Sequence, residues 1–149
     1  MTTIDYADLP TLAGRDLGFS EYRTVTQEQI NTFADATDDH QWIHVDPERA
    51  ASGPFGAPIA HGFLTLSLAV AFWTELLEVE GVGTKVNYGL DKVRFPAPVT
   101  VGSRIRMSAV IAEVAEIPGG YQLVVDQTVE IEGGSKPAVA ARGLYRFYK

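Results

Sequence analysis

The most apolar stretch of the chain runs from Ile59 to Trp73, and its apolar residues occupy almost every side of a helix rather than one stripe. No Asp, Glu, Lys or Arg occurs between Arg49 and Glu75. A helix with so little polar face must be enclosed by other elements of the fold. A transmembrane helix is the alternative, but Pro58 and Glu75 bracket fewer than the ~20 residues that a bilayer requires. The pattern therefore favours a buried helix over a membrane span.

The last third of the chain alternates apolar and polar residues with the period of two that is typical of half-buried antiparallel strands. Ile105 and Met107, for example, alternate with Arg104 and Arg106. The pattern predicts strands over about residues 85–95, 104–111, 121–131 and 138–148, with a shorter strand around 19–25. In the first of these strands, the apolar residues change from one set of alternating positions to the other near Asp91, which indicates a bulge or bend.

These elements together predict an α+β fold, in which a curved antiparallel sheet wraps around one long central helix. The 149 residues are enough for one domain with a core and too few for two of ordinary size, so we expect a single domain over residues 1–149. Such a sheet leaves at least one edge strand unpaired. Edge-to-edge pairing of two copies would cover that edge, and we therefore expect a homodimer.

Two helix starts precede the apolar helix. Thr26 can cap a helix whose Gln29 side chain reaches back toward the Thr26 N–H, and Phe33 follows at helical spacing. A shorter helix is expected from Asp46, with a proline at its first position. The segment between them, residues 38–45, is expected to be a loop.

Composition narrows the possible partners and chemistry. A formal net charge of -7 without any Lys/Arg-rich run argues against nucleic acid or an anionic membrane as the main partner. The absence of cysteine excludes disulfides, thiolate nucleophiles and thiolate metal sites. The first residues lack the basic start and apolar run of a secretory signal, so we expect a cytoplasmic protein.

The loop at residues 38–45 concentrates titratable groups: two adjacent carboxylates, Asp38 and Asp39, and two of the three histidines, His40 and His44. A carboxylate and an imidazole separated by four residues across a loop can converge on one water and relay a proton near neutral pH. The alternative is that these groups only cap turns and bond the backbone. A metal site is the weaker interpretation, because His40 and His44 lack the His-Glu-x-x-His pattern and no third ligand is evident.

A second candidate lies where the apolar helix starts, at His61 and Gly62. The first amides of a helix have no acceptor within it, and the helix dipole favours negative charge there. Glycine at position 62 would let a carbonyl oxygen approach the backbone N–H closely, as in an oxyanion site. The alternative is that Gly62 only permits a tight contact between the helix and the sheet.

Three blocks of sequence contain these candidates. They are Phe33-Ala34-x-x-Thr37-x-Asp39-x-x-x-Ile43-His44-x-Asp46-Pro47, Pro58-Ile59-Ala60-His61-Gly62-Phe63-Leu64 and Phe95-Pro96-Ala97-Pro98-Val99-x-Val101-Gly102. Together they resemble the MaoC-like dehydratase family, the (R)-specific enoyl-CoA hydratases of the hot-dog fold, and especially its nodulation protein N-like branch. The likeness covers roughly residues 15 to 148.

The resemblance implies that Asp39 and His44 are the catalytic pair, that the Gly62 amide binds the thioester carbonyl, and that Asp38 is a bystander. In this family the pair holds a water for syn addition to a trans-2-enoyl-CoA, which gives the (3R)-hydroxyacyl thioester, or for the reverse dehydration. No metal is implied, and no cofactor beyond the CoA of the substrate. The substrate is expected to be an acyl-CoA or acyl-carrier thioester. A thioesterase of the same fold and a non-catalytic acyl-thioester-binding protein are the alternatives.

Two departures from the family pattern bear on the acyl pocket. Gln41-Trp42 stands where many members have Asn-Pro, and Val70 stands where they have a serine near the catalytic histidine. We expect Trp42 to narrow or redirect the pocket. Ser67 is a candidate replacement for the missing serine, and His61 is a third candidate pocket residue.

Basic residues of the strands are candidates for contacting the phosphates of CoA or of an acyl carrier. These residues are Lys92, Arg94, Arg104 and Arg106. The alternative for each of them is a place on the solvated face of its strand.

Overall fold

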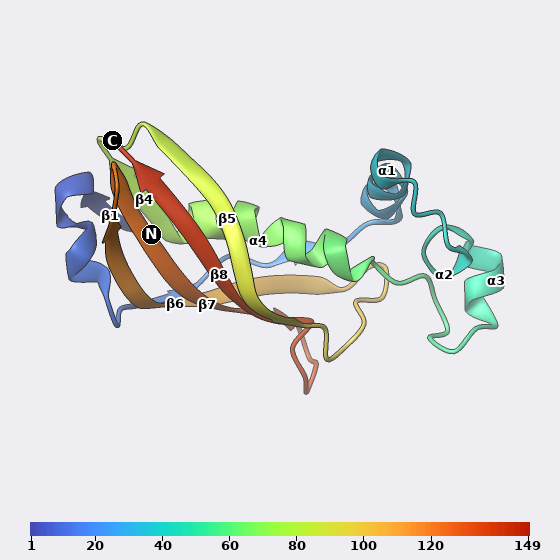
Figure 1. Ribbon diagram of the computed structural model, residues 1–149. Helices are drawn as coiled ribbons and strands as arrows, with labels where there is room; N and C mark the ends of the chain where they lie inside the picture. The colour runs from blue at the N-terminus through green and yellow to red at the C-terminus, as the bar shows by residue number, and fades with distance from the viewer.

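A six-stranded antiparallel sheet curves around one long helix, α4, in the computed structural model, which describes residues 1–149 (Figure 1). The strand order is β2-β6-β7-β8-β5, and β3 pairs with another part of β6. The strands are β2 (Asp16–Phe19), β3 (Arg23–Thr24), β5 (Thr84–Arg94), β6 (Arg104–Ile117), β7 (Gly120–Ile131) and β8 (Val139–Tyr148). The predicted α+β fold with a curved sheet and a central helix is confirmed.

The core lies between α4 (Gly62–Leu76) and the concave face of the sheet. From the helix, Phe72 is fully buried, and from the sheet Ile105, Met107 and Ile111 are fully buried as well. Burying a side chain of this size stabilises a fold by roughly 1.5–3 kcal/mol. The alternating pattern predicted for β6 is therefore confirmed. No helix of the protein combines the length and the apolar character that crossing a membrane requires.

Strand β5 is bent where the sequence predicted a bend. Its register with β8 shifts between Asn87 and Gly89, and again between Leu90 and Lys92. Such bulges increase the local twist and curve the strand. The parity change near Asp91 therefore corresponds to a real irregularity in the pairing.

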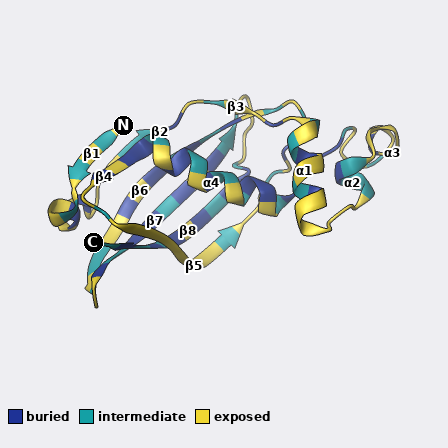
Figure 2. Cartoon of the chain, turned by 90° about the horizontal axis from the view of Figure 1, so that it is seen from above, coloured by how far each residue is buried: buried dark blue, intermediate teal, exposed yellow.

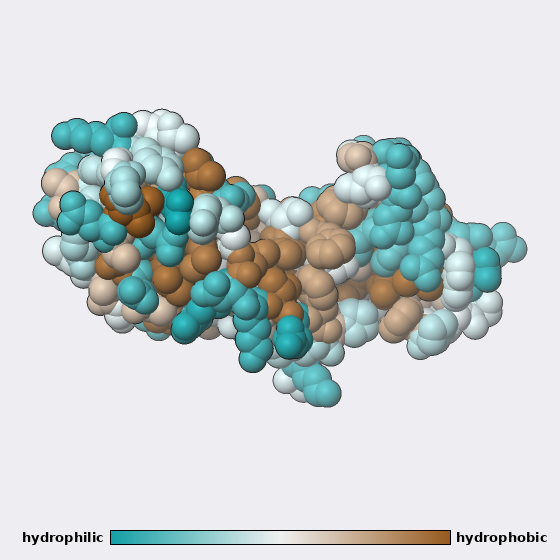
Figure 3. Space-filling model, in the orientation of Figure 1, coloured by the Kyte–Doolittle hydropathy of each residue, from teal (hydrophilic) through white to brown (hydrophobic).

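The sheet covers α4 on one side only, which corrects the prediction of a fully enclosed helix. Phe63 is 69% exposed and Val70 is 41% exposed, although both belong to the apolar helix. Strand β5 forms the neighbouring free edge of the sheet, and it appears as exposed along most of its length (Figure 2). Hydrophobic residues therefore lie open across the middle of the molecule (Figure 3). A single copy of the chain cannot bury this side of α4.

The N-terminal part of the chain differs from the sequence prediction. In place of one strand near residues 19–25, the chain forms the two short strands β2 and β3. A separate pair, which was not predicted, joins β1 (Thr2–Asp5) in parallel to β4 (Leu77–Glu80). The alternation in β4 spans only four residues and continues directly from α4, so the helical pattern masks it. Between β1 and β2, the 3-10 helix Tyr6–Leu12 buries two leucines in the core.

Three short helices lie at the end of the molecule opposite both chain termini (Figure 1). Helix α1 (Gln27–Thr37) starts as predicted, because the Thr26 hydroxyl accepts a bond from the Gln29 N–H at 3.2 Å. Helix α3 (Pro47–Ala51) is capped in the same way by Asp46. Between them, residues expected to form only a loop contain the one-turn helix α2 (Trp42–Val45). This segment carries the candidate chemistry.

Candidate active site

Backbone hydrogen bonds bring the three sequence blocks side by side. The Ala60 N–H donates to the Val99 carbonyl at 2.8 Å, which joins the second block to the third. On its other side, the Ile59 N–H donates to the Ile43 carbonyl at 3.0 Å, which joins the second block to α2. The segment just before α4 is therefore held from two directions. This arrangement fixes the start of α4 relative to α2.

His44 is a buried residue of α2 with one ring nitrogen engaged. It is 6% exposed, and its Nδ1 lies 2.6 Å from the Ile59 carbonyl oxygen. A carbonyl oxygen only accepts, so Nδ1 carries the hydrogen of this bond and Nε2 of the neutral ring is free to accept a proton. The backbone of His44 is also tied to α1, because the Gln27 side-chain amide donates to the His44 carbonyl at 2.8 Å.

Burial lowers the pKa of His44 below its ordinary value. The bond to the Ile59 carbonyl acts in the opposite direction, and the neighbouring His61 adds to the lowering. The charge of Asp39 raises the pKa by the smallest contribution. The neutral imidazole is thus favoured at neutral pH, and this is the form that can accept a proton.

Asp39 approaches His44 because the chain turns sharply at the end of α1. Asp38 caps this helix in the left-handed conformation, with a φ of 58°. After this turn, side-chain atoms of Asp39, His44 and His61 lie within 4.8 Å of one another. Asp39 itself is exposed, and its carboxylate accepts only a long bond of 3.4 Å from the Gln41 N–H. The carboxylate is therefore available for a water or a substrate.

The other two titratable groups of this segment point elsewhere. His40 is exposed, and its Nε2 lies 2.9 Å from a carboxylate oxygen of Asp35, on α1. Asp38 is also exposed and serves as the helix cap. Of the four residues that the sequence placed in one cluster, the structure brings together Asp39 and His44.

Gly62, the first residue of α4, lies beside a cavity of about 310 Å³ that His44 also lines. The remaining lining is mostly apolar and comes from Phe55, Ile59, Ala60, Thr65, Phe95, Ala97, Pro98, Val99 and Ala138. The Gly62 N–H has no acceptor within the helix and donates no other backbone bond. A Cβ at this position would meet the Phe95 ring at 3.0 Å. Glycine at position 62 therefore allows the Phe95 ring to pack closely against the start of α4 and leaves the Gly62 N–H without an acceptor in the protein.

Two of the candidate pocket residues lie outside this cavity. Trp42 is half-buried and faces α3, with the Arg49 guanidinium 4.3 Å from its ring centroid. His61 is 2% exposed and lies against the ring of His44, with the two ring centroids 3.9 Å apart. His61 is thus a neighbour of the candidate base rather than part of the cavity wall.

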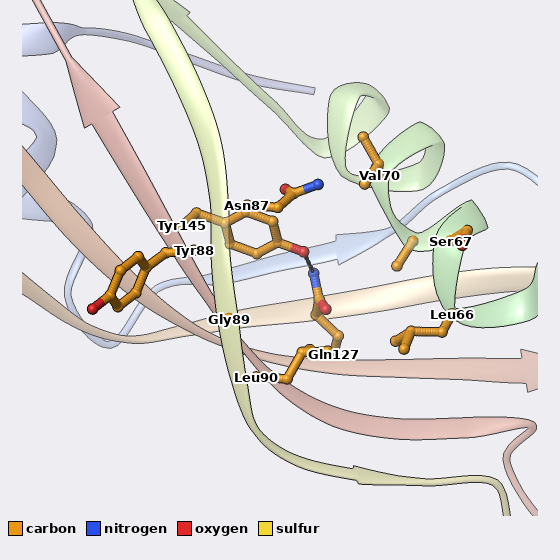
Figure 4. Close-up of a pocket in the computed structure, with 10 residues that line it drawn as sticks. Leu66, Ser67, Val70, Asn87, Tyr88, Gly89, Leu90, Gln127 and Tyr145 are labelled. Atoms are coloured by element: carbon orange, nitrogen blue, oxygen red, sulfur yellow. Dashed lines mark hydrogen bonds between the residues drawn. The ribbon is translucent and has the colours of Figure 1, made fainter. Parts of the chain in front are cut away.

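Ser67 lines a second cavity of about 310 Å³, which lies between α4 and β5 (Figure 4). Its hydroxyl donates back to the Phe63 carbonyl at 2.7 Å. Gln127 and Tyr145 bond to each other and also line this cavity. Gln127, which is 2% exposed, was not among the candidate residues predicted from the sequence. The alternation along the strand could have identified Gln127 as buried, because it lies two residues from Val125 and its side chain points to the same face of β7.

A metal ion does not suit the cluster of Asp39, His44 and His61. The two rings are stacked with only 23° between their planes. An ion bound to both would lie well out of both ring planes, where no lone pair points. One nitrogen of each ring is also engaged with a backbone carbonyl. The arrangement is instead suited to proton transfer between a water and Nε2 of His44.

Comparisons with known proteins agree with this geometry. The family model described as MaoC like domain matches residues 8–132. The chain belongs to the MaoC-like family. It is 54% identical over 142 residues to 3-hydroxyacyl-thioester dehydratase Z of Mycobacterium tuberculosis, covering 95% of this chain and 94% of that protein. It is also 48% identical over 148 residues to nodulation protein N of Rhizobium leguminosarum bv. viciae, covering 97% and 91%.

The solved structures agree on the fold. The unliganded R-hydratase PhaJ1 from Pseudomonas aeruginosa matches with a TM-score of 0.74 at 22% identity, covering 92% of this chain and 82% of that one. This MaoC-like protein therefore has the hot-dog fold, and the resemblance found in the three sequence blocks is confirmed. Together with the close dehydratase relative, the family shows that the protein is a hydro-lyase.

We expect the His44 imidazole of this MaoC-like protein to titrate below the ordinary histidine value of about 6.5. Because its pKa is lowered in the folded state, that state binds fewer protons than the unfolded chain in this range. The contribution of neutral His44 to stability is therefore complete above the ordinary value and is lost as the pH falls below it. A nitrogen-15 NMR titration of the three histidines, assigned with His44→Gln, measures this directly. A His44 midpoint at or above the ordinary value would contradict it.

Proposed function

We propose that the protein catalyses reversible hydration of a trans-2-enoyl thioester to the (3R)-hydroxyacyl thioester. One observation carries the proposal: His44, whose Nε2 is free, lines the same cavity as Gly62, and the exposed carboxylate of Asp39 lies close to the His44 ring. The name of the dehydratase relative supports an acyl thioester as substrate. The mostly apolar lining of the cavity suits an acyl chain.

The proton balance follows from the state of His44. During hydration, Nε2 of His44 accepts a proton from the water while the water oxygen bonds to C3 of the enoyl group. The electron pair of the double bond moves toward the thioester, and the resulting enolate oxygen accepts the Gly62 N–H. The imidazolium then returns the proton to C2 from the same side, which gives syn addition. Dehydration is the reverse of these steps.

Asp39 orients the water in this scheme. Its carboxylate accepts the second hydrogen of the water and stabilises the positive charge that forms on His44. Positioned acid–base transfer contributes about 10²–10⁴-fold to a rate. A backbone donor at the enolate oxygen contributes roughly 3 kcal/mol. These two contributions require no group beyond Asp39, His44 and the amide of Gly62.

Two alternatives make different products or none. A thioesterase would direct the water at the carbonyl carbon and release a free thiol, whereas hydration releases none. A non-catalytic binder would form no product. Closure of the pocket by Trp42 would support a binder, but Trp42 packs beneath Arg49 and does not line the cavity. The free Nε2 of His44 beside an open cavity supports catalysis.

Removing either proton-handling group should cost on the order of 100-fold or more in the hydration rate. The variants are Asp39→Asn and His44→Ala, and loss of enoyl-thioester absorbance with crotonyl-CoA and longer chains measures the rate. Asp38→Asn and His40→Ala are matched controls from the same segment and should keep wild-type rates. Full activity in the Asp39 and His44 variants, or no activity of the wild type at any chain length, would refute the proposal. A partial loss at His44 alone would move the role of principal base to Asp39.

We infer that two copies pair through β5, which agrees with the homodimer expected from the sequence. The outer edge of β5 has unpaired backbone groups, and Tyr88 and Leu90 on this strand are 55% and 46% exposed. Phe63 and Val70 of α4 add to the same apolar surface. A second β5 would satisfy the backbone and cover these side chains. It would also close the second cavity, which Val70, Tyr88 and Leu90 line.

A charge placed on this surface should separate the copies. Leu90→Asp would bury an unpaired carboxylate in the pairing, so we expect a monomer in sedimentation equilibrium at micromolar concentration, where the wild type is a dimer. Val110→Asp is the control, because Val110 lies on β6 and is 38% exposed away from this edge. A monomeric wild type, or a dimeric Leu90 variant, would contradict pairing through β5.

The ion pairs narrow the candidates for contacting the phosphates of the thioester carrier. Arg104 pairs with Glu132 at 3.0 Å and Arg106 pairs with Glu130 at 2.6 Å, so their charges are compensated. None of the five ion pairs includes Lys92 or Arg94. Both residues lie at the end of β5, and Arg94 directly precedes Phe95 of the cavity wall. We infer that Lys92 and Arg94 contact the carrier phosphates.

Loss of these two cations should weaken binding of a phosphate-bearing thioester without affecting the chemical step. We expect Lys92→Ala and Arg94→Ala to raise KM for crotonyl-CoA several-fold and to leave kcat unchanged. The same variants should not change KM for the N-acetylcysteamine thioester, which carries no phosphate. Arg104→Ala serves as the control. An equal KM change with both thioesters would assign the two residues another role.

A further inference from the structure

His61 lies between two aromatic side chains at the start of α4. One face of its ring stacks on His44, and Phe33 of α1 lies 4.8 Å away, tilted by 54°. The side chain is 2% exposed and does not line the cavity. It therefore cannot serve as a general wall residue for the acyl chain. Besides Phe33, its side chain contacts the two residues of the proposed catalytic pair.

The polar contact of His61 is to the backbone of Asp39. Nε2 of His61 lies 3.0 Å from the Asp39 carbonyl oxygen, so Nε2 carries the hydrogen and donates it. Apart from the long contact with the Gln41 N–H, no other hydrogen bond holds this residue. The place of the Asp39 carboxylate thus depends on the bond from His61.

We propose that His61 is a positioning residue: its Nε2–H anchors the loop that carries Asp39, and its ring packs against His44 and fixes the plane of that imidazole. The reaction in which the pair acts rests on the proposed function above. The anchoring itself is a property of the fold and does not depend on the substrate. Misplacement of a reacting group by about 1 Å can cost on the order of 100-fold in rate, so such an anchor affects kcat.

The proposal also has a consequence for acid–base behaviour. The charged or polar groups that face His44 are the Asp39 carboxylate, the His61 ring and the Ile59 carbonyl, and the cavity side is mostly apolar. Of these, His61 lowers the pKa of His44. Its replacement by an uncharged side chain should raise the pKa of His44. A residue that only filled space would leave this pKa unchanged.

Two variants separate the hydrogen bond from the ring contact. His61→Phe keeps an aromatic ring against His44 but removes the donor, and we expect kcat for hydration to fall about 10-fold or more with little change in KM. His61→Gln places an amide N–H near the former Nε2 and loses the ring, and we expect it to recover part of the lost kcat. In both, the acid limb of the pH dependence of kcat/KM should move to higher pH. His40→Gln, a change at an exposed histidine of the same segment, is the control.

NMR of the histidine side chains gives a readout that is independent of activity. A rise of the His44 midpoint in both variants supports positioning even if the wild type hydrates no thioester, in which case only the proposed reaction fails. Unchanged kcat and an unchanged His44 midpoint in both variants would overturn the positioning role. If neither variant folds, NMR of the wild type tests the role. A His61 ring protonated on Nε2, with that N–H protected from solvent exchange, supports it. Protonation on Nδ1 overturns it.

Discussion

The buried hydrogen bond from Nδ1 of His44 to the Ile59 carbonyl is the contact on which the rest of the site depends. It determines which ring nitrogen is free, and it ties α2 to the segment that leads into α4. A buried donor left without its acceptor would cost about 1–3 kcal/mol, so this bond stabilises the orientation of the His44 ring. The N–H of Ile59 bonds to Ile43 in turn, so one residue holds α2 through both of its polar groups. Any displacement of the start of α4 would therefore move His44 with it, so these bonds tie the position of the His44 ring to that of Gly62.

Helix α4 supports the first turn that contains Gly62, and it also has an apolar side that the sheet does not cover. Its middle is held by core residues such as Phe72, which makes its first turn a rigid support for the Gly62 amide. Its opposite side keeps Phe63 and Val70 exposed beside the unpaired edge of β5. The sheet therefore leaves one side of α4 uncovered. The proposed pairing of two copies through β5 would cover it.

The sequence predicted those features that arise from neighbouring residues. The alternation in β6 and the cap at Thr26 depend on spacings of a few residues, and Asp39 and His44 lie in one short segment, so their meeting needed only a turn. Contacts set by strand register could not be read in this way. Arg106 was a candidate for phosphate contact as a basic residue of a strand, and its ion-pair partner Glu130 could not be recognised because only the pairing of β6 with β7 places the two opposite each other. The position of His61 behind His44 likewise follows from a contact between separate segments, the bond from the Ile59 N–H to the Ile43 carbonyl that joins the segment before α4 to α2.

The opposite environments of His44 and Asp39 suit the proposed mechanism, in which a single imidazole carries the proton in both directions. Burial and His61 make the imidazolium unfavourable, while the Ile59 carbonyl and the charge of Asp39 make it less so. A base that was held too firmly in its neutral form would not take a proton from water, and one that was easily protonated would not return it to carbon. The opposing effects suit a His44 that is neutral at rest and charged only briefly in the proposed reaction, while the Asp39 carboxylate stays in contact with solvent. A buried Asp39 would lose this function, since its own desolvation would oppose the charge that it must keep. The exposure of the loop after α1 thus suits the proposed chemistry, and the proposed bond from the buried His61 would hold this exposed loop in place.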